Sequence, residues 1–176
     1  MTYQGIDIRQ LRDLVVRPTL DAIGLGGAAA EELMIGTILQ ESGGGHWLHQ
    51  LGTGPAVGIC QMEPATHDDL WRNFLRSRPD LAAKVQRLMV EAQVGEDGAG
   101  GFAAKPDNGV GRAGEMAGNL YYAVAMARLV YAGVPEPLPP AGDSAAQAAY
   151  YKRHYNTADG AATVAQYMAN WQRAIT

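Results

Sequence analysis

Apolar residues recur at helical spacing along most of the chain, and this pattern predicts most of its structure. A first run over residues 8–20 predicts a helix that bends or restarts at Pro18, because a proline biases the residue before it, here Arg17, away from the helical region. Residues 28–42 carry apolar side chains too densely for a surface helix, so we expect a helix that is buried on most sides. Glycines 43–45 favour the left-handed conformation that ends a helix.

The rest of the chain alternates periodic segments with stretches rich in glycine and proline. Further helices are expected at about residues 64–75, 79–92, 114–132, 144–154 and 159–174, several of them behind an Asp, Ser or Thr that suits an N-cap. Residues 94–113 have no periodicity and predict a long loop, which in a compact domain is functional or mobile. Residues 56–61 are the only plausible strand. The pattern therefore predicts a mainly α fold with little or no β-structure.

Composition and charge narrow the class of protein. With 176 residues, 47% of them hydrophobic, the chain supports one sizeable core rather than two domains. A formal charge of −4 without a basic patch argues against a nucleic-acid partner. No apolar run approaches the length of about 18 residues that would span a bilayer, and the first residues do not resemble a signal peptide. We therefore expect no membrane insertion and synthesis in the cytoplasm without an export tag.

Glu41 is the residue whose position raises a chemical question. It lies in the last turn of the dense apolar helix, where the negative end of the helix dipole and burial against Ile38, Ile59 and Met62 both disfavour a charged carboxylate. A pKa raised to about 6 would let it hold a proton near neutral pH, as a general acid must. From position alone, the simpler interpretation is that Glu41 pairs with an arginine or caps a loop.

Glu41 belongs to the first of four short motifs that follow one another in order along most of the chain. They are Glu41-Ser42, then Gly58-Ile59-Cys60-Gln61-Met62 with Pro64-Ala65-Thr66, then Asn119-Leu120 ahead of residues 123–127, then Tyr155-Asn156-Thr157 with Gly160. In order and spacing they resemble the soluble lytic transglycosylase (SLT) branch of the lysozyme superfamily, over roughly residues 35–167. The resemblance implies one lysozyme-like helical domain with a substrate cleft over residues 1–176, in which residues 1–27 form a helical extension and residues 28–176 the SLT-like core.

The resemblance also implies an activity, cleavage of the MurNAc–GlcNAc β-1,4 bond of bacterial peptidoglycan. Glu41 corresponds to the single catalytic acid of the family, which then serves as the base. Tyr155 corresponds to the tyrosine whose hydroxyl reaches that carboxyl group, although a tyrosine packed in the core is the alternative. Here His154 replaces the alanine that usually precedes the Tyr-Asn pair, and Cys60 replaces a bulky apolar residue. These departures bear on substrate fit more than on chemistry.

Further residues of the motifs are expected to bind substrate. Ser42 would hydrogen-bond sugar oxygens, or would merely be a polar residue at a helix end. Gln61 and Met62 would form the floor of the cleft, with an exposed loop glutamine as the alternative for Gln61. Asn156 would bind substrate or hold a turn, and Trp47 would either stack on a sugar face or plug the core. We expect no metal and no cofactor.

A second carboxylate would decide between two glycosidase chemistries. Hydrolases usually place another Asp or Glu across the scissile bond. None lies between Ser42 and Met62, and the nearest candidates, Glu63, Asp68 and Asp69, are explained as charges at a helix N-terminus. With one carboxylate, attack by the C6 hydroxyl of MurNAc is favoured, and it gives a 1,6-anhydro product. A hydrolytic lysozyme with a second carboxylate remains the alternative.

Other classes of protein compete with this hypothesis. A cysteine peptidase would pair Cys60 with His67 or His154, and a zinc site would combine His46 and His49 with a further ligand such as His67 or Glu41. A non-catalytic module could retain the cleft to bind glycan or to build a virion.

The missing export tag favours one source among peptidoglycan-degrading enzymes. The segments around Glu41 and residues 58–71 resemble phage-encoded members of the family. Such a protein would reach the cell wall from a virion or through a pore made by another protein. The expected partners are peptidoglycan strands and other phage virion or lysis proteins.

Overall fold

The structure is a computed structural model that describes residues 5–90, 111–156 and 160–175. The described chain is mainly helical, which confirms the predicted class. Its elements are α1 (Ile8–Gln10), η1 (Leu11–Val16), α2 (Arg17–Ile23), α3 (Ala28–Ser42), α4 (Pro64–Asp69), η2 (Leu70–Phe74), η3 (Leu75–Ser77), α5 (Pro79–Gln86), η4 (Gly111–Ala117), α6 (Leu120–Ala132), α7 (Ser144–Tyr151), η5 (Lys152–Asn156) and α8 (Val164–Ile175). None of these helices is long and apolar enough to cross a membrane.

The N-terminal helices run through Pro18 without a break, so the predicted restart there is wrong. Arg17 has helical angles, φ −56° and ψ −53°, and its N–H bonds to the carbonyl of Arg12. That bond spans five residues, the pattern of a π-helical turn, and such a turn fills η1 immediately before the proline. The wider turn accommodates the ring and the absent N–H of Pro18 within a continuous helix.

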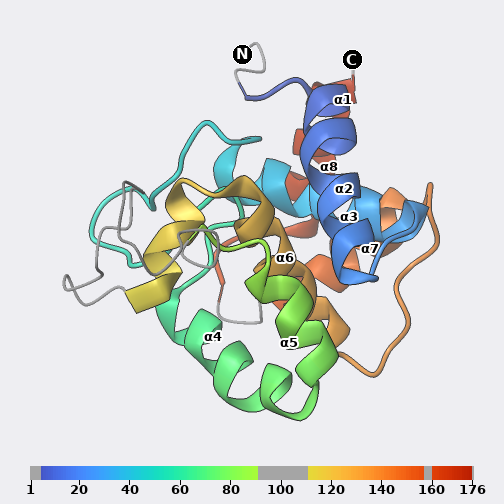
Figure 1. The fold of residues 1–176 in the computed structure, drawn as a ribbon. Helices are drawn as coiled ribbons and strands as arrows, with labels where there is room; N and C mark the ends of the chain where they lie inside the picture. The colour runs from blue at the N-terminus through green and yellow to red at the C-terminus, as the bar shows by residue number, and fades with distance from the viewer. Residues whose placement is uncertain (1–4, 91–110, 157–159, 176) are drawn as a thin grey trace.

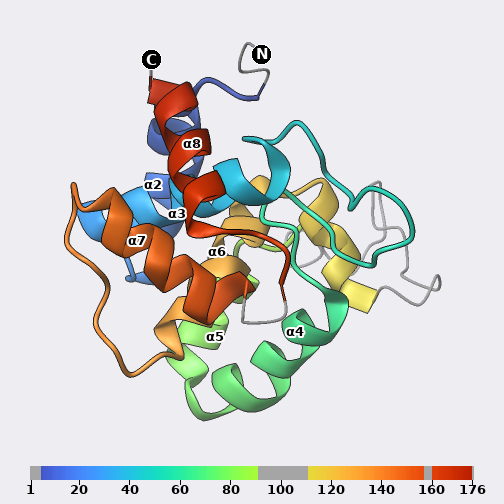
Figure 2. The same ribbon diagram turned by 180° about the vertical axis from the view of Figure 1, so that it is seen from behind.

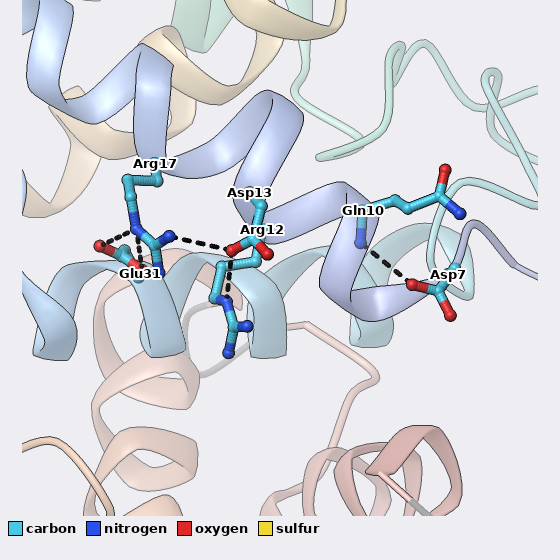
Figure 3. Close-up of polar contacts among 6 residues, drawn as sticks. All are labelled: Asp7, Gln10, Arg12, Asp13, Arg17 and Glu31. Carbon is cyan, nitrogen blue, oxygen red and sulfur yellow. Dashed lines mark hydrogen bonds and ion pairs between the residues drawn. The ribbon is translucent and has the colours of Figure 1, made fainter.

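The N-terminal helices also belong to the main core. Leu11, Val16 and Leu20 are fully buried in the same apolar cluster as α3 and α6. Arg17 adds a polar tie, since its guanidinium lies 2.9 Å from Asp13 and 2.9 Å from Glu31 of α3 (Figure 3). Asp7 caps α1, because its carboxylate accepts a hydrogen bond from the Gln10 N–H (Figure 3). Residues 8–23 thus contribute side chains to the same core as α3 and α6.

Helix α3 is the central element, as its dense apolar sequence predicts. Figure 1 shows α1 and α2 in front of it, and Figure 2 shows α7 and α8 on the opposite side. Ile38 and Met34 are fully buried. Gly36 is required because a side chain there would run into the ring of Tyr167 from α8. Helix α3 ends at Gly43, which has φ +63°, as expected from the glycine run.

The other predictions for secondary structure hold to different degrees. Asp143 caps α7 as expected, with Oδ1 accepting from the Ala146 N–H at 2.9 Å. The helix predicted from residue 114 begins instead at α6, where Asn119 caps it, and η4 precedes it as a tighter 3₁₀ helix. The expected strand at 56–61 is wrong for the described chain, which has only isolated bridges at Val57. Most of the loop predicted at 94–113, and the caps Thr157 and Asp159, lie outside the described residues.

Candidate active site

A pocket of about 520 Å³ opens at the C-terminal end of α3. It is lined by residues from α3, the 50–63 segment, α4, α6, η5 and the start of the 160–162 segment: Glu41, Gln50, Ala56, Gln61, Met62, Glu63, Thr66, Val130, Tyr155, Asn156, Gly160, Ala161 and Ala162. In Figure 2, η5 continues from the end of α7 on the left, and the 43–63 loop and α4 lie to its right. The pocket therefore joins parts of the chain that are far apart in sequence.

Glu41 reaches this pocket from the last turn of α3. Burial raises its pKa to about 7, and a hydrogen bond that favours the carboxylate offsets only part of this effect. The donor is the Tyr151 hydroxyl, 2.5 Å from Oε1. The simpler interpretation of Glu41 was an ion pair with an arginine. Among the described residues, the arginines pair instead with Asp13, Glu31 and Glu136. Glu41 is a carboxyl group able to hold or release a proton near neutral pH.

The tyrosine that contacts Glu41 differs from the one expected, which corrects the sequence prediction. The Tyr155 hydroxyl donates to the Cys60 carbonyl at 2.8 Å, so its one proton is committed to the 58–62 turn. Tyr151, one helical turn earlier, makes the bond to Glu41 instead. The two rings stack with centroids 6.0 Å apart and planes inclined by 23°. Both tyrosines serve the site, Tyr151 at the carboxyl group and Tyr155 on the pocket wall.

An aromatic cluster behind these tyrosines supplies the desolvation. The rings of Tyr151 and Tyr167 lie 5.2 Å apart, and those of Tyr131 and Tyr155 lie 5.5 Å apart. The Tyr131 hydroxyl is 2.7 Å from that of Thr37 on α3, which in turn donates to the Leu33 carbonyl. Such ring-to-ring packing excludes water from one side of Glu41, and this is the physical origin of its raised pKa.

A tight turn forms the opposite wall. Val57 and Met62 exchange two backbone hydrogen bonds of 3.0 Å each, which closes the loop between them. Gly58 has φ +79°, and a side chain there would lie 2.5 Å from the carbonyl oxygen of Met116, so only glycine fits. Gln61 has φ +46°, the one positive φ of a non-glycine residue in the described chain. This strained backbone brings the Gln61 side chain to the pocket, where its amide nitrogen donates to the Gly58 carbonyl at 2.8 Å.

The remaining predicted site residues divide into those that line the pocket and those that do not. Met62 and Asn156 line it, in agreement with the prediction. Ser42 does not: it is fully buried, its hydroxyl donates to the Ile38 carbonyl at 3.1 Å and accepts from the Gly45 N–H at 2.9 Å. The expected sugar contact of Ser42 is therefore wrong, and the residue ends α3. Trp47 is 43% exposed, which excludes the core plug, but it lies outside the pocket lining.

Sequence reasoning missed or undervalued three residues at or beside the pocket, Tyr151, Gln50 and Glu63. Tyr151 had a usable signal, since residues four apart on a helix share a face, as Tyr151 and Tyr155 do here. Gln50 lies in the loop after α3, where no motif marks it. Its Oε1 accepts a hydrogen bond from the Ala56 N–H at 3.3 Å. Glu63, one of the candidates for a second carboxylate that the sequence explained as a helix-terminal charge, lines the same pocket as Glu41. The pocket thus holds two carboxyl groups.

The residues of the alternative cysteine-peptidase and zinc sites do not lie together in the described part of the chain. Cys60 is buried, and burial together with the nearby Glu41 raises the pKa of its thiol, which disfavours the thiolate that a peptidase needs. His67 bonds to Tyr122 at 2.6 Å and to Asp68 at 2.9 Å, and His154 pairs with Glu136 at 3.0 Å. Within residues 5–90, 111–156 and 160–175, no group of three His, Cys, Asp or Glu side chains is placed to hold a metal ion.

Comparison with known proteins adds no family to this description. No protein-family model, no curated protein and no solved structure matches the chain.

Proposed function

We propose that this protein cleaves the MurNAc–GlcNAc β-1,4 bond of bacterial peptidoglycan, with Glu41 as the acid and base of a lytic transglycosylase. The observation that carries the proposal is the protonatable Glu41 in the pocket, with its pKa raised by burial to about 7. The order of the four motifs supports the same activity and a lysozyme-like architecture of the SLT type.

The pocket contains the groups that a sugar chain needs. Gln50, Gln61 and Asn156 offer amides, and Thr66 offers a hydroxyl, for the hydroxyl and acetamido groups of the sugars. Met62, Val130 and the ring of Tyr155 offer apolar surface to the sugar faces. Such a mixture of apolar walls and a few convergent polar groups is typical of sites for small and polymeric ligands.

The geometry of Glu41 suits a single-carboxylate mechanism. The Tyr151 hydroxyl holds Oε1, which leaves Oε2 as the oxygen that faces a substrate. Protonated Glu41 would give its proton to the glycosidic oxygen as the bond to C1 breaks. The resulting carboxylate would take the proton of the C6 hydroxyl while that oxygen closes on C1. Glu41 ends the cycle protonated, and the product is a 1,6-anhydro sugar.

Hydrolysis is the second candidate, because Glu63 lines the same pocket. As a carboxylate, Glu63 would activate a water molecule for attack on C1. Mass spectrometry of muropeptides released from purified sacculi in oxygen-18 water separates the two reactions. Unlabelled 1,6-anhydro ends, lighter by one water, support the transglycosylase, whereas reducing ends that carry the heavy oxygen support the hydrolase. Wild-type protein that binds sacculi and releases nothing would instead indicate a non-catalytic glycan-binding module.

The place of action is part of the proposal. The substrate lies outside the cytoplasmic membrane, so the protein would act on the wall from a virion or after passage through a pore made by a partner. The resemblance to phage-encoded relatives supports this route, and a labelled antibody against the chain, applied to phage particles and to lysing cells, distinguishes the two.

A further inference from the structure

A second cavity lies beside α4, and the function proposed above does not use it. It has a volume of about 380 Å³ and is lined by His67, Asp68, Trp71 and Arg72. These residues come from α4 and from η2, which continues the same helix. A helix turns once in about 3.6 residues, so this set lies on a different side of it from Thr66, which lines the first pocket. One helix thus separates the two cavities.

A buried tyrosine holds one side of the second cavity in place. The hydroxyl of Tyr122, a fully buried residue of α6, accepts a hydrogen bond from Nε1 of Trp71 at 2.8 Å. Nε2 of His67, which is also buried, lies 2.6 Å from the same hydroxyl. The indole N–H is therefore used inside the protein, and the half-buried ring of Trp71 contributes apolar surface to the cavity.

Two opposite charges line the cavity without pairing with each other. Asp68 and Arg72 are both exposed and lie four residues apart, the spacing at which an acid and a base pair on a regular helix. The π-helical turn that begins at Leu70 lies between them and changes their relative direction. Oδ1 of Asp68 lies 2.9 Å from Nδ1 of His67 instead. Arg72 has no ion pair or hydrogen bond with any residue that the structure describes, so its guanidinium group is available to a ligand.

The combination of these groups defines the class of ligand. A guanidinium group binds a carboxylate through two parallel hydrogen bonds, and the Asp68 carboxylate can bind an ammonium group through Oδ2. An anion without a positive charge, such as phosphate, is disfavoured by the same carboxylate. The ring of Trp71 suits methyl groups and short aliphatic chains between two charged ends. The cavity therefore fits a short peptide that carries both a free carboxylate and a free amine.

We propose that this cavity binds the peptide stem of peptidoglycan, with Arg72 on a stem carboxylate, Asp68 on the free amine of its diamino acid and Trp71 against its alanine methyl groups. The inference rests on the proposed function, which places the sugar chain in the first pocket. With its side chains a helix is about 10–12 Å wide, and an extended peptide of four residues reaches about 13–14 Å. A stem that leaves a MurNAc unit in the first pocket is therefore long enough to pass α4 and reach the second cavity.

A titration with free peptide tests the site and needs no activity. The probe is a synthetic stem tetrapeptide with a free diamino-acid amine and free carboxylates. The chain has three tryptophans, and in protein labelled with nitrogen-15 the indole N–H signal lost in Trp71→Phe identifies Trp71. That signal should move with a Kd of about 1–10 mM, which matches the millimolar effective concentration of a tethered stem. No movement at peptide concentrations well above this range would overturn the proposal.

Changes to the peptide and to the protein should match each other. Arg72→Gln should weaken binding by about 5 to 10-fold, and a peptide with amidated carboxylates should lose as much with wild type. Amidation should then cost Arg72→Gln little more, because both changes remove the same contact. Asp68→Asn and acetylation of the peptide amine form a second pair of this kind. The control is Arg76→Gln, which removes an exposed arginine of η3 outside the cavity lining and should bind as wild type does.

Two further results would overturn the assignment of the ligand. An unchanged Kd in Arg72→Gln would mean that the peptide binds without the guanidinium group. Inorganic phosphate that moves the Trp71 signal as far as the peptide does, with an equal Kd, would mean that the cavity is a simple anion site.

Sacculi connect the second cavity to the proposed activity. Where wild-type protein cleaves them, removal of the stems with an amidase should raise the concentration of sacculi needed for half-maximal rate by about 3 to 10-fold. In Arg72→Gln this difference between stripped and intact sacculi should largely disappear, and an undiminished difference would contradict the role of Arg72. A wild-type protein that cleaves neither substrate would remove the proposed function, while the peptide titration still decides whether the cavity binds the stem.

Discussion

The two walls of the pocket are built on different physical principles. On the helical wall, formed by α3 and η5, the Glu41 carboxyl group accepts a hydrogen bond from Tyr151 of the adjoining α7, whose ring stacks on that of Tyr155. On the loop wall, residues 50–63 present amides and backbone groups held by a turn in which Gly58 and Gln61 both have positive φ. The helical wall sets the proton affinity of one group, and the loop wall shapes a surface. We therefore expect changes on the first to alter turnover and pH dependence, and changes on the second to alter binding.

The largest effect should come from Glu41→Gln on the helical wall. The amide keeps the shape of the side chain but has no proton to give, so release of soluble muropeptides from sacculi should fall by about 10³-fold or more. Binding to sacculi, measured by co-sedimentation, should stay within a few-fold of wild type. Residual cleavage within tenfold of wild type would exclude Glu41 as the acid.

A pair of matched variants tests which tyrosine serves the acid. Tyr151→Phe should lower turnover by about 10 to 1000-fold, since it removes an oriented hydrogen bond at the reacting centre. Tyr155→Phe loses a bond to the Cys60 carbonyl and should cost about 1 kcal/mol of unfolding free energy with turnover close to wild type. Steady-state kinetics and urea unfolding of both proteins make the comparison. The reverse order of the two turnover effects would restore the assignment expected from the motif.

The pH dependence of stability provides a test that involves no substrate. Glu41 has a pKa of about 7 in the folded protein and near 4.5 when unfolded, so the folded state binds more protons between these values. Stability from this group is therefore complete below about pH 4.5 and is lost as pH rises through 7, by about 3 kcal/mol in all. Urea unfolding at pH 5 and pH 8 should show a lower free energy of unfolding at pH 8 in the wild type. In Glu41→Gln, the part of this decrease that comes from Glu41 should be absent. Identical pH dependence in both proteins would contradict the raised pKa.

A smaller effect is expected from Cys60→Ala, at the point where the two walls touch. Its carbonyl still accepts the bond from Tyr155, and only a buried thiol is lost. We expect about 1–2 kcal/mol less stability from the small cavity and unchanged chemistry. Thermal unfolding and muropeptide release check the two parts. A well-folded Cys60→Ala protein without any activity would bring back the thiol nucleophile.

The smallest effect should come from the loop wall. Gln61→Gly removes the side chain and relieves the positive φ, so it should leave stability unchanged or raise it by up to about 1 kcal/mol. The concentration of sacculi needed for half-maximal rate should rise about 3 to 10-fold, with maximal turnover little changed. A fall in turnover at unchanged half-saturation would place Gln61 with the helical wall and break the division between the two.

The sequence predicts those features that depend on local pattern. The apolar density of residues 28–42 leads to a buried helix, and the position of Glu41 at its end leads to a raised pKa, which the structure bears out. The strand expected at residues 56–61 does not form, and the chain instead closes a turn between Val57 and Met62.

The sequence does not predict features that depend on which side of a helix a residue faces, or on packing between residues far apart in the chain. The segments Leu11–Val16 and Lys152–Asn156 are π-helical, which changes the residues that face a given side, and no pattern of residue types marks such turns. The conformational rule for the residue before a proline led to the expected break at Pro18, and the motif led to Tyr155 being expected where Tyr151 lies. Ser42 follows Glu41 in the motif, yet it points into the helix end.

The distance along the chain between Glu41 and its tyrosine partner has a consequence for how the protein is made. The two residues are separated by 110 positions, and Tyr151 is translated long after α3 has left the ribosome. Because contacts between distant residues form late in folding, the acid remains without its donor until α7 docks. A chain that is released early, before residue 151, would carry the Glu41 carboxyl group without the hydroxyl that holds it. The order of synthesis thus leaves incomplete copies without the full site on which the proposed activity depends.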